Sequence, residues 1–196
     1  MGSYVVEELK AKGCKSVFIP RSKDYDLTDE RNIRVMYENA EPDIVIHLAA
    51  AVGGIGANER YPGTFFYRNA IMGIQLMELA RQYGIKKFVT IGTTCSYPKY
   101  AAIPFKEEDL WEGYPTEVTA PYGLAKKILF VQSQAYEKEF GFNSINLIPV
   151  NLYGPRDNFN PETSHVIPAL IKRFVDAERE GTKEVVCWGT GEASRE

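Results

Sequence analysis

Short apolar runs alternate with amphipathic stretches along most of the chain. The apolar runs are rich in β-branched residues, as is typical of strands buried on both faces of a sheet, and they cover residues 16–20, 43–48, 87–92 and 144–150. Stretches with helical spacing cover residues 28–39, 64–83, 122–140 and 166–180. This alternation predicts an α/β fold with a doubly wound parallel sheet, and a last apolar run at 184–188 is a candidate for an outlying strand.

The two ends of the sequence differ from a complete fold of this kind. The chain begins in a helical pattern over residues 4–9 with Gly13 as its C-cap, whereas a doubly wound nucleotide-binding fold begins one strand earlier, with a glycine-rich turn. At the other end the sequence stops directly after a polar turn. We therefore expect the first strand and most of a carboxyl-terminal substrate domain to be absent. On this division, residues 1–162 form a partial dinucleotide-binding domain and residues 163–196 begin the substrate-binding region.

The absent strand has a predicted place in the sheet. In the strand order 3-2-1-4-5-6 it would lie at the centre, between the strands at 16–20 and 87–92. Both of these neighbours would then depend on it for backbone hydrogen bonds.

Composition and charge exclude several classes of function. The chain has 196 residues and a net charge of −3 with no long run of like charge, so no nucleic-acid partner is expected. Cys14, Cys95 and Cys187 are widely spaced and form no CxxC pair, which argues against a disulfide framework and against a metal site. No apolar run approaches the ~18 residues that a membrane helix needs. These properties predict a cytoplasmic protein with no membrane partner.

The loops at the carboxyl ends of the predicted strands are the candidate binding site, because ligands of open α/β sheets bind there. Arg21 and Lys23 follow the first apolar run, where a basic residue can accommodate the 2′-phosphate of NADP. Ala49 and Ala50 follow the second run, and their small side chains let the backbone approach a ligand closely. The glycines of residues 53–56 do not open a predicted helix, so they are not counted as a dinucleotide fingerprint.

The third loop carries the strongest chemical signal. The run at 87–92 leads into Thr93 and Thr94, and Tyr122 and Lys126 lie four residues apart on one face of a following helix. A lysine ammonium beside a phenol stabilises tyrosinate and is expected to lower the pKa of the tyrosine toward the working pH. A threonine hydroxyl can bind a carbonyl oxygen beside it. The set therefore has the groups that proton transfer to a carbonyl needs during hydride transfer.

Two further candidates are interpreted as structural. Tyr83 and Lys87 have the same spacing, but they straddle Gly84 at the entrance to a strand, at the end of the sheet away from the ligand site. His47 lies inside a predicted buried strand and is interpreted as a core residue.

Thr93, Tyr122 and Lys126 together resemble the catalytic set of the extended short-chain dehydrogenase/reductase family. Other segments resemble one branch of that family, which acts on GDP-bound keto sugars. These segments are 47–50 (HLAA), 52–58 (VGGIGAN), 97–99 (YPK), 151–155 (NLYGP), 157–159 (DNF) and 164–170 (SHVIPAL). The resemblance implies a Rossmann-like, NAD(P)-binding fold. It also implies a reaction in which GDP-4-keto-6-deoxy-D-mannose is epimerised at C3 and C5 and its C4 ketone is then reduced with NADPH.

The same resemblance implies roles for individual residues. Cys95 and His165 match the acid-base pair that carries out epimerisation, and Thr93 stands where the family commonly has serine. The positions that match cofactor-binding residues are Gly2, Arg21, Lys23, Ala49, Ala50, Tyr122, Lys126, Asn151 and Leu152. The positions that match substrate-binding residues are Arg173, Trp188 and Arg195. The resemblance also implies that the intact protein is a homodimer.

Two alternative functions remain open. A related nucleotide-sugar epimerase or dehydratase would retain NAD instead of consuming NADPH, and the basic residues of the first loop together with Cys95 and His165 argue against it. The other alternative is a catalytically silent fragment that keeps the fold. The intact hydroxyl, tyrosine and lysine set argues against this second alternative.

Overall fold

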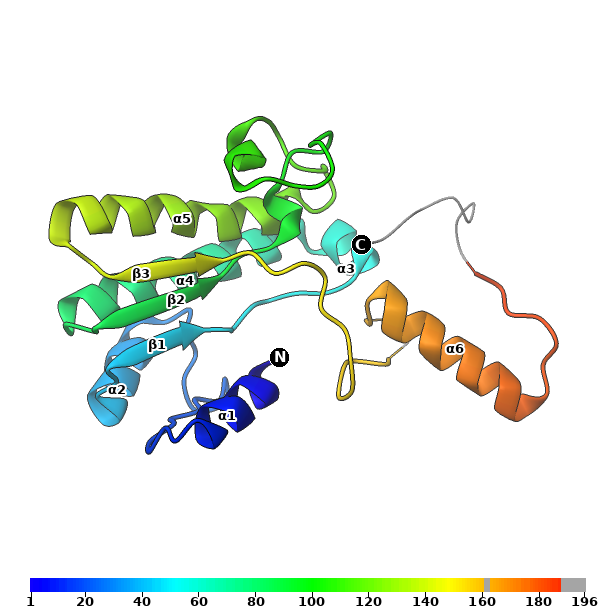
Figure 1. Ribbon diagram of the computed structural model, residues 1–196, viewed down its shortest axis with the longest axis horizontal. Coiled ribbons are helices and arrows are strands. Elements are labelled where there is room, and N and C mark those ends of the chain that lie inside the picture. The colour runs from blue at the N-terminus through cyan, green and yellow to red at the C-terminus, as the bar shows by residue number, and fades with distance from the viewer. Residues whose placement is uncertain (161–162, 188–196) are drawn as a thin grey trace.

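A parallel sheet of three strands forms the centre of the computed structural model, which describes residues 1–160 and 163–187 (Figure 1). In spatial order the strands are β1 (Ile44–His47), β2 (Lys87–Ile91) and β3 (Ser144–Leu147). The two ladders place His47 opposite Thr90 and Thr90 opposite Asn146. Because the strands are parallel, their carboxyl ends meet at one edge of the sheet, where ligands of open α/β folds bind.

Six α-helices and two short 3₁₀ helices make up the rest of the regular structure in the described residues. They are α1 (Gly2–Ala11), α2 (Glu30–Ala40), α3 (Ile55–Arg60), α4 (Pro62–Gln82), η1 (Thr94–Ser96), η2 (Glu107–Trp111), α5 (Ala120–Phe140) and α6 (Val166–Glu180). Local sequence sets several of their ends. Asp29 caps α2 by accepting the Arg31 N–H at 2.9 Å, and prolines occupy the first turns of α4 and α5. Gly141 and Gly181 end α5 and α6 in the left-handed conformation.

The main core lies on one face of the sheet, which α4 and α5 cover (Figure 1). Its fully buried side chains include Ile33 of α2, Met77 of α4, Phe88 of β2 and Leu129 of α5. Burial of apolar surface stabilises a fold by roughly 25 cal/mol per Å² removed from water, and it is the main force that holds these helices on the sheet.

The opposite face of the sheet remains open in the described residues, so the prediction of strands buried on both faces is wrong. Ile145 and Leu147 of β3 are 42% and 47% exposed. The physical reason is that the described helices leave this face uncovered, since α1 buries none of its residues and α6 lies away from the sheet (Figure 1).

The expected strand at 16–20 is not formed. These residues have no regular secondary structure, and Phe18 and Ile19 are exposed. A parallel strand obtains its hydrogen bonds from a neighbouring strand, and within the described residues none pairs with this segment.

The expected strand order is also wrong. That order separated the runs at 43–48 and 87–92, whereas β1 pairs directly with β2. Because β2 is paired on both sides, the free edges of the described sheet are β1 and β3, and an added strand would lie next to one of these and not next to β2.

The predicted helices are confirmed. The helices expected at 28–39, 64–83, 122–140 and 166–180 correspond to α2, α4, α5 and α6, and the helix at 4–9 to α1, after which Gly13 takes a positive φ. Residues 184–187 of the outlying candidate strand form no strand, and residue 188 lies outside the described residues. Among the described helices, none has an apolar stretch that could cross a bilayer.

Candidate active site

The end of β2 leads directly into the turn that carries the candidate hydroxyl and thiol groups. Gly92 is buried there, and a Cβ at this position would lie 2.5 Å from Cζ of Phe130 on α5. Thr93 is the N-cap of η1, and its Oγ1 accepts the N–H of Cys95 at 3.2 Å. A glycine at the strand end therefore lets α5 approach closely, while the threonine hydroxyl fixes the backbone of Cys95.

A second close approach joins η1 to the first turn of α5. Ser96, which is fully buried, donates its hydroxyl to the carbonyl oxygen of Gly123 at 2.8 Å. A Cβ on Gly123 would lie 2.2 Å from the carbonyl oxygen of Cys95, so only glycine permits this packing. Because Tyr122 precedes Gly123, the contact brings the candidate acid and the candidate thiol base into one place. Thr93 and Cys95 therefore stand next to the first turn of α5, which carries Tyr122, and their sharing of one catalytic site stays a prediction.

Burial controls the protonation of the tyrosine and lysine pair. Burial, with a smaller contribution from Cys95, raises the pKa of Tyr122 to about 12. Burial lowers the pKa of Lys126 to about 8. The expected lowering of the tyrosine pKa is therefore wrong for this structure, because losing water disfavours the phenolate and no hydrogen bond joins Lys126 to Tyr122 in the described residues. Tyr122 accordingly remains protonated at neutral pH, which is the state that a proton donor requires.

His47 lies beneath this site at the carboxyl end of β1. It is buried, and its pKa is lowered to about 3 by burial and by the charge of Lys126. The same rung of the sheet holds Thr90, whose hydroxyl donates to Asn146 Oδ1 at 2.6 Å. The interpretation of His47 as a core residue is confirmed. Its neutral side chain is one of the buried polar groups near Lys126.

Asn69 of α4 holds the loop after β1, a role that sequence reasoning missed. Its side chain accepts the N–H of Ala51 at 2.9 Å and donates to the carbonyl oxygens of Ala51 at 2.8 Å and Phe65 at 2.6 Å. Ala49 and Ala50 directly precede Ala51, to which Asn69 is hydrogen-bonded, and both are exposed. An amide in the apolar pattern of residues 64–83 was the available signal, because a buried amide needs partners of this kind.

The glycine-rich stretch after this loop does open a helix, contrary to expectation. Gly54 is the N-cap of α3, and Asn58 Nδ2 donates to the carbonyl oxygens of Gly53 and Gly54 at 3.0 Å each. These two hydrogen bonds compensate for the poor helix propensity of glycine. A Cβ on Gly54 would lie 3.3 Å from the carbonyl oxygen of Ser164, so this turn lies close to the segment that precedes α6.

Two further candidates, His165 and Arg173, lie at the start of α6 and within it. His165 is the N-cap of α6, is exposed and makes no capping hydrogen bond through its side chain. Arg173 of α6 donates Nη1 to the carbonyl oxygen of Val186 at 3.1 Å. Trp188 and Arg195 lie outside the described residues.

The start of α1 meets the same edge of the sheet. A Cβ on Gly2 would lie 3.8 Å from Leu48 Cδ1, directly after β1. The hydroxyl of Tyr4 donates to the Pro155 carbonyl oxygen at 3.0 Å in the loop after β3. The N-terminal end of a helix, which attracts anions, thus lies beside the loops that follow β1 and β3.

The remaining cofactor candidates are exposed. Asn151 and Leu152 follow β3 in the loop that contacts α1 through its later residues, whereas Arg21 and Lys23 lie in the irregular segment between α1 and α2. The structure therefore brings Gly2, Asn151 and Leu152 to one edge of the sheet but does not join Arg21 and Lys23 to it by any hydrogen bond. In the described part of the chain, no group of three or more His, Cys, Asp or Glu side chains is placed to hold a metal ion.

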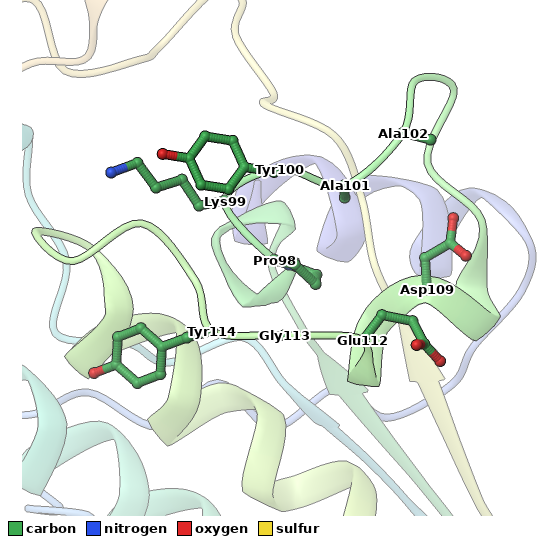
Figure 2. A pocket seen from close by; sticks show the side chains of 9 residues that line it. All are labelled: Pro98, Lys99, Tyr100, Ala101, Ala102, Asp109, Glu112, Gly113 and Tyr114. Atoms are coloured by element: carbon green, nitrogen blue, oxygen red, sulfur yellow. The ribbon is translucent and has the colours of Figure 1, made fainter.

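Residues 97–119, between η1 and α5, form a long loop segment that contains η2 and projects above the sheet (Figure 1). This segment is called the excursion below. A cavity of about 290 Å³ lies within it, between residues 98–102 on one side and residues 109 and 112–114 on the other (Figure 2). On this second side the side chains of Asp109 and Glu112 point in different directions, and Tyr114 lies apart from both (Figure 2). None of the catalytic candidates lines this cavity, so it is separate from the chemistry described above.

Comparison with known proteins agrees with this geometry. The chain belongs to the NAD dependent epimerase/dehydratase family, whose model matches residues 1–196. Among curated proteins, the chain is 38% identical to GDP-L-fucose synthase 1 of Arabidopsis thaliana and 35% identical to GDP-L-fucose synthase of Escherichia coli K12. Each match covers 100% of this chain and 61% of the relative, so the chain spans about three fifths of their length.

A solved structure supports the same relationship. The GDP-L-fucose synthetase of Naegleria fowleri bound to NADP has a TM-score of 0.88 and 32% identity to this chain, covering 99% of this chain and 64% of that one. These findings confirm the predicted fold class and the predicted family resemblance.

Proposed function

We propose that the chain carries the catalytic centre of an NADPH-dependent epimerase-reductase that converts GDP-4-keto-6-deoxy-D-mannose to GDP-L-fucose. The observation that carries this proposal is the contact between Gly123 and the carbonyl oxygen of Cys95. Tyr122 precedes Gly123, and Cys95 also contributes to the raised pKa of Tyr122. Both observations support one shared site for epimerisation and reduction. The relatives named GDP-L-fucose synthase supply the substrate class.

Epimerisation needs a base and an acid on either side of a carbon next to the C4 ketone. The ketone acidifies the hydrogens on C3 and C5. Cys95 as a thiolate removes one of these protons, and the electron pair of the broken C–H bond moves to the ketone oxygen as an enolate. His165 returns a proton to the same carbon from the other side, so its configuration inverts with no net change in electrons. Cys95 then releases its proton to water and His165 takes one up from water, and the same exchange at the second carbon completes the two inversions.

Reduction of the C4 ketone then needs one proton from the protein. NADPH, when bound, supplies the hydride that adds to the carbonyl carbon. Tyr122 donates its phenolic proton to the carbonyl oxygen, and its pKa of about 12 keeps that proton available at neutral pH. The Thr93 hydroxyl donates a hydrogen bond to the same oxygen. Lys126 stabilises the tyrosinate that remains, because its ammonium lies on the same helix face one turn later.

The residues present fit a dinucleotide. Gly2 at the start of α1, Ala49 and Ala50 after β1, and Asn151 and Leu152 after β3 would hold it at the carboxyl edge of the sheet. The Lys126 ammonium is buried, and no carboxylate forms an ion pair with it in the described residues, which suits contact with cofactor hydroxyls.

Preference for NADPH rests on two basic residues. Arg21 and Lys23 are assigned to the 2′-phosphate because arginine and lysine are the usual phosphate-binding side chains. Both are exposed and thus available to an anionic ligand.

We further propose that residues 1–162 contribute the dinucleotide-binding part and residues 163–196 the start of the substrate-binding part. Arg173, Trp188 and Arg195 are assigned to the nucleotide sugar, with the arginines on its diphosphate. The protein is proposed to be cytoplasmic.

A homodimer is also proposed. The helices α4 and α5, which cover one face of the sheet, carry exposed apolar side chains. These are Tyr67 and Ile74 on α4 and Val131 on α5. Apolar side chains on adjacent helices are typical of an interface between subunits. Light scattering on wild-type protein and on a Tyr67→Glu/Val131→Glu variant tests this, and a monomer in both cases would contradict it.

The proposed function is tested by measuring its two half-reactions separately. Protein is incubated with GDP-4-keto-6-deoxy-D-mannose in deuterium oxide without NADPH, and deuterium at C3 and C5 is measured by mass spectrometry. Cys95→Ser and His165→Asn are expected to suppress this exchange. Cys14→Ser, which changes an exposed cysteine at the end of α1, is the matched control and leaves exchange unchanged. Exchange at the wild-type rate in both site variants would refute the assignment of the two residues.

The alternative of an epimerase that retains NAD makes a different prediction. Such an enzyme returns the hydride in each cycle, so it interconverts epimers with no net consumption of NADPH. The proposed enzyme oxidises one NADPH for each fucose nucleotide formed. Measuring cofactor absorbance against product therefore separates these two functions.

A further inference from the structure

Two neighbouring lysines of α5 are buried in different surroundings. Lys126 faces the proposed catalytic site, whereas Lys127 faces the excursion of residues 97–119. Lys127 is 5% exposed, and its Nζ donates a hydrogen bond to the carbonyl oxygen of Leu110 in η2. Its Nζ also lies 4.5 Å from the ring centroid of Trp111. Of the α5 side chains, this one alone hydrogen-bonds the excursion in the described residues.

The excursion is otherwise held largely by its own contacts. The Lys99 N–H donates to the carbonyl oxygen of Tyr114 at 3.0 Å, which closes the excursion on itself beside the cavity (Figure 2). The ring of Phe105 stacks on that of Tyr97, with centroids 4.6 Å apart. These contacts hold the excursion together, and its contacts with α5 come from the packing of Leu110 and Tyr97 on Phe130 and from Lys127.

A line of contacts leads from Lys127 to Cys95. Leu110, whose carbonyl accepts the lysine hydrogen bond, packs in a small buried cluster with Tyr97 and Phe130. Tyr97 ends η1, the 3₁₀ turn that contains Cys95. Movement of η2 away from α5 would therefore open this cluster and remove the packing on Tyr97, leaving η1 held on α5 by the Ser96 hydrogen bond to Gly123.

The hydrogen bond matters because Leu110 is buried. A buried carbonyl without a donor is destabilising, and no other donor reaches this oxygen in the described residues. Burial lowers the pKa of Lys127, but the amine can donate in either protonation state. The attachment therefore does not depend on the charge of the lysine alone.

We propose that Lys127 is a positioning residue for Cys95. It holds the excursion on α5 and so keeps the η1 turn in the geometry that the base of the epimerisation needs. The role of Cys95 as a base rests on the proposed function, whereas the attachment itself does not. The test therefore reads the exposure of the thiol and involves no turnover.

The experiment compares the alkylation rates of Cys95 and Cys14 by iodoacetamide in the same protein, followed by peptide mass spectrometry. Lys127→Met is expected to raise the rate at Cys95 by roughly 10-fold or more, the scale of one lost hydrogen bond from a charged group. The exposed Cys14 is the internal control and keeps its rate. Removing a positive charge also favours the unreactive thiol form, so a faster rate cannot arise from electrostatics.

Matched variants separate attachment from general destabilisation. Lys138→Met removes an exposed lysine from the same helix and is expected to leave Cys95 unchanged. Lys127→Arg keeps a donor and a cation over the ring, so it is expected to restore the wild-type rate. Hydrogen exchange of residues 97–119 is expected to rise in Lys127→Met, while exchange in the buried part of α4 stays constant.

Three results would overturn this inference. The first is equal alkylation of Cys95 in Lys127→Met and Lys138→Met, and the second is an equal rise in alkylation of Cys14. The third is alkylation of Cys95 that is as fast in Lys127→Arg as in Lys127→Met. If Lys127→Met does not fold, Trp111→Leu replaces it, because Trp111 is 49% exposed and its loss removes only the ring contact. That variant is expected to raise the Cys95 rate by a smaller factor, and no rise would equally refute the role.

Discussion

The junction of β2, η1 and α5 and the segment from residue 12 to residue 29 both carry candidate site residues, but they are built in opposite ways. In the junction neither Gly92 nor Gly123 has room for a side chain, because Gly92 faces the ring of Phe130 and Gly123 faces the backbone of Cys95. In the other segment no helix or strand forms, and Arg21 and Lys23 are exposed.

This difference follows the chemistry expected of each region. Proton transfer needs groups held within hydrogen-bond distance of a reacting atom, so its residues stand on elements that pack closely against one another. Attraction of a phosphate works over several ångströms, so basic side chains on a loosely packed segment can serve it. We therefore expect substitutions in the junction to have larger effects than those in the segment.

The largest effect is expected from Tyr122→Phe. Loss of the phenolic proton should lower NADPH oxidation by roughly 10²- to 10⁴-fold, the usual contribution of a positioned acid. Deuterium exchange at C3 and C5 should continue, because it depends on Cys95 and His165. Tyr83→Phe is the control, since this tyrosine has the same spacing to a lysine but donates to Glu38 on the surface. An unchanged rate of NADPH oxidation in Tyr122→Phe would contradict the role of Tyr122 as the proton donor.

The packing of the junction itself is tested by Gly123→Ala. The new Cβ would lie 2.2 Å from a backbone oxygen, which cannot move aside as a flexible side chain can. We expect a loss of about 3 kcal/mol or more in the free energy of unfolding, measured with urea. Gly63→Ala in α4 is the control, because a Cβ there meets nothing within 4 Å and should stabilise the helix by ~0.5–1 kcal/mol. Equal stabilities for the two variants would show that η1 and α5 are not tightly packed.

The exposed segment is tested by cofactor preference. Arg21→Gln combined with Lys23→Gln should weaken NADPH binding more than NADH binding by about 1–3 kcal/mol, the value of lost charge-assisted hydrogen bonds. Calorimetric titration with each cofactor measures this difference. Lys10→Gln with Lys12→Gln removes two exposed cations from the end of α1 and should not change the preference. An equal loss for both cofactors would assign the charges of Arg21 and Lys23 to the fold alone.

The last expected effect is the contribution of Lys126 to the pH dependence of stability. Its pKa is lowered from 10.5 to about 8 in the folded protein, so the unfolded chain binds a proton that the folded chain has lost between these values. The free energy of unfolding should therefore rise with pH across this window, by about 3 kcal/mol in total. Comparing wild type with Lys126→Met in urea at pH 7.5 and pH 10 isolates this contribution, which should disappear in the variant. A parallel pH dependence in both proteins would mean that Lys126 is hydrated.

Much of the fold could be predicted because its elements have strong local signals. The helical spacing of α4, α5 and α6, with prolines at the starts of α4 and α5 and glycines after α5 and α6, predicted these helices nearly to their ends. The strand at 16–20 failed for a non-local reason: its apolar pattern was suitable, but no strand lies beside it in the described residues. The helix at Gly54 was missed because Asn58 stabilises it through hydrogen bonds that the spacing of glycines does not predict.

The amino-acid sequence alone supplied the candidate groups for the proposed chemistry. A hydroxyl at a strand end, and a tyrosine and lysine one helical turn apart, are local patterns that can be seen without a structure. Cys95 and His165 were identified only through resemblance to a family, because a lone cysteine or histidine has no periodic signal.

Tertiary structure decided how these groups work. The pKa of Tyr122 rises and does not fall, since burial removes the water that would stabilise the phenolate, and this depends on everything packed around the ring. Asn69 and Lys127 also acquire their roles only through contacts with distant segments. Local patterns reflect the geometry of a single helix or strand, whereas burial and hydrogen bonding depend on residues that folding brings together.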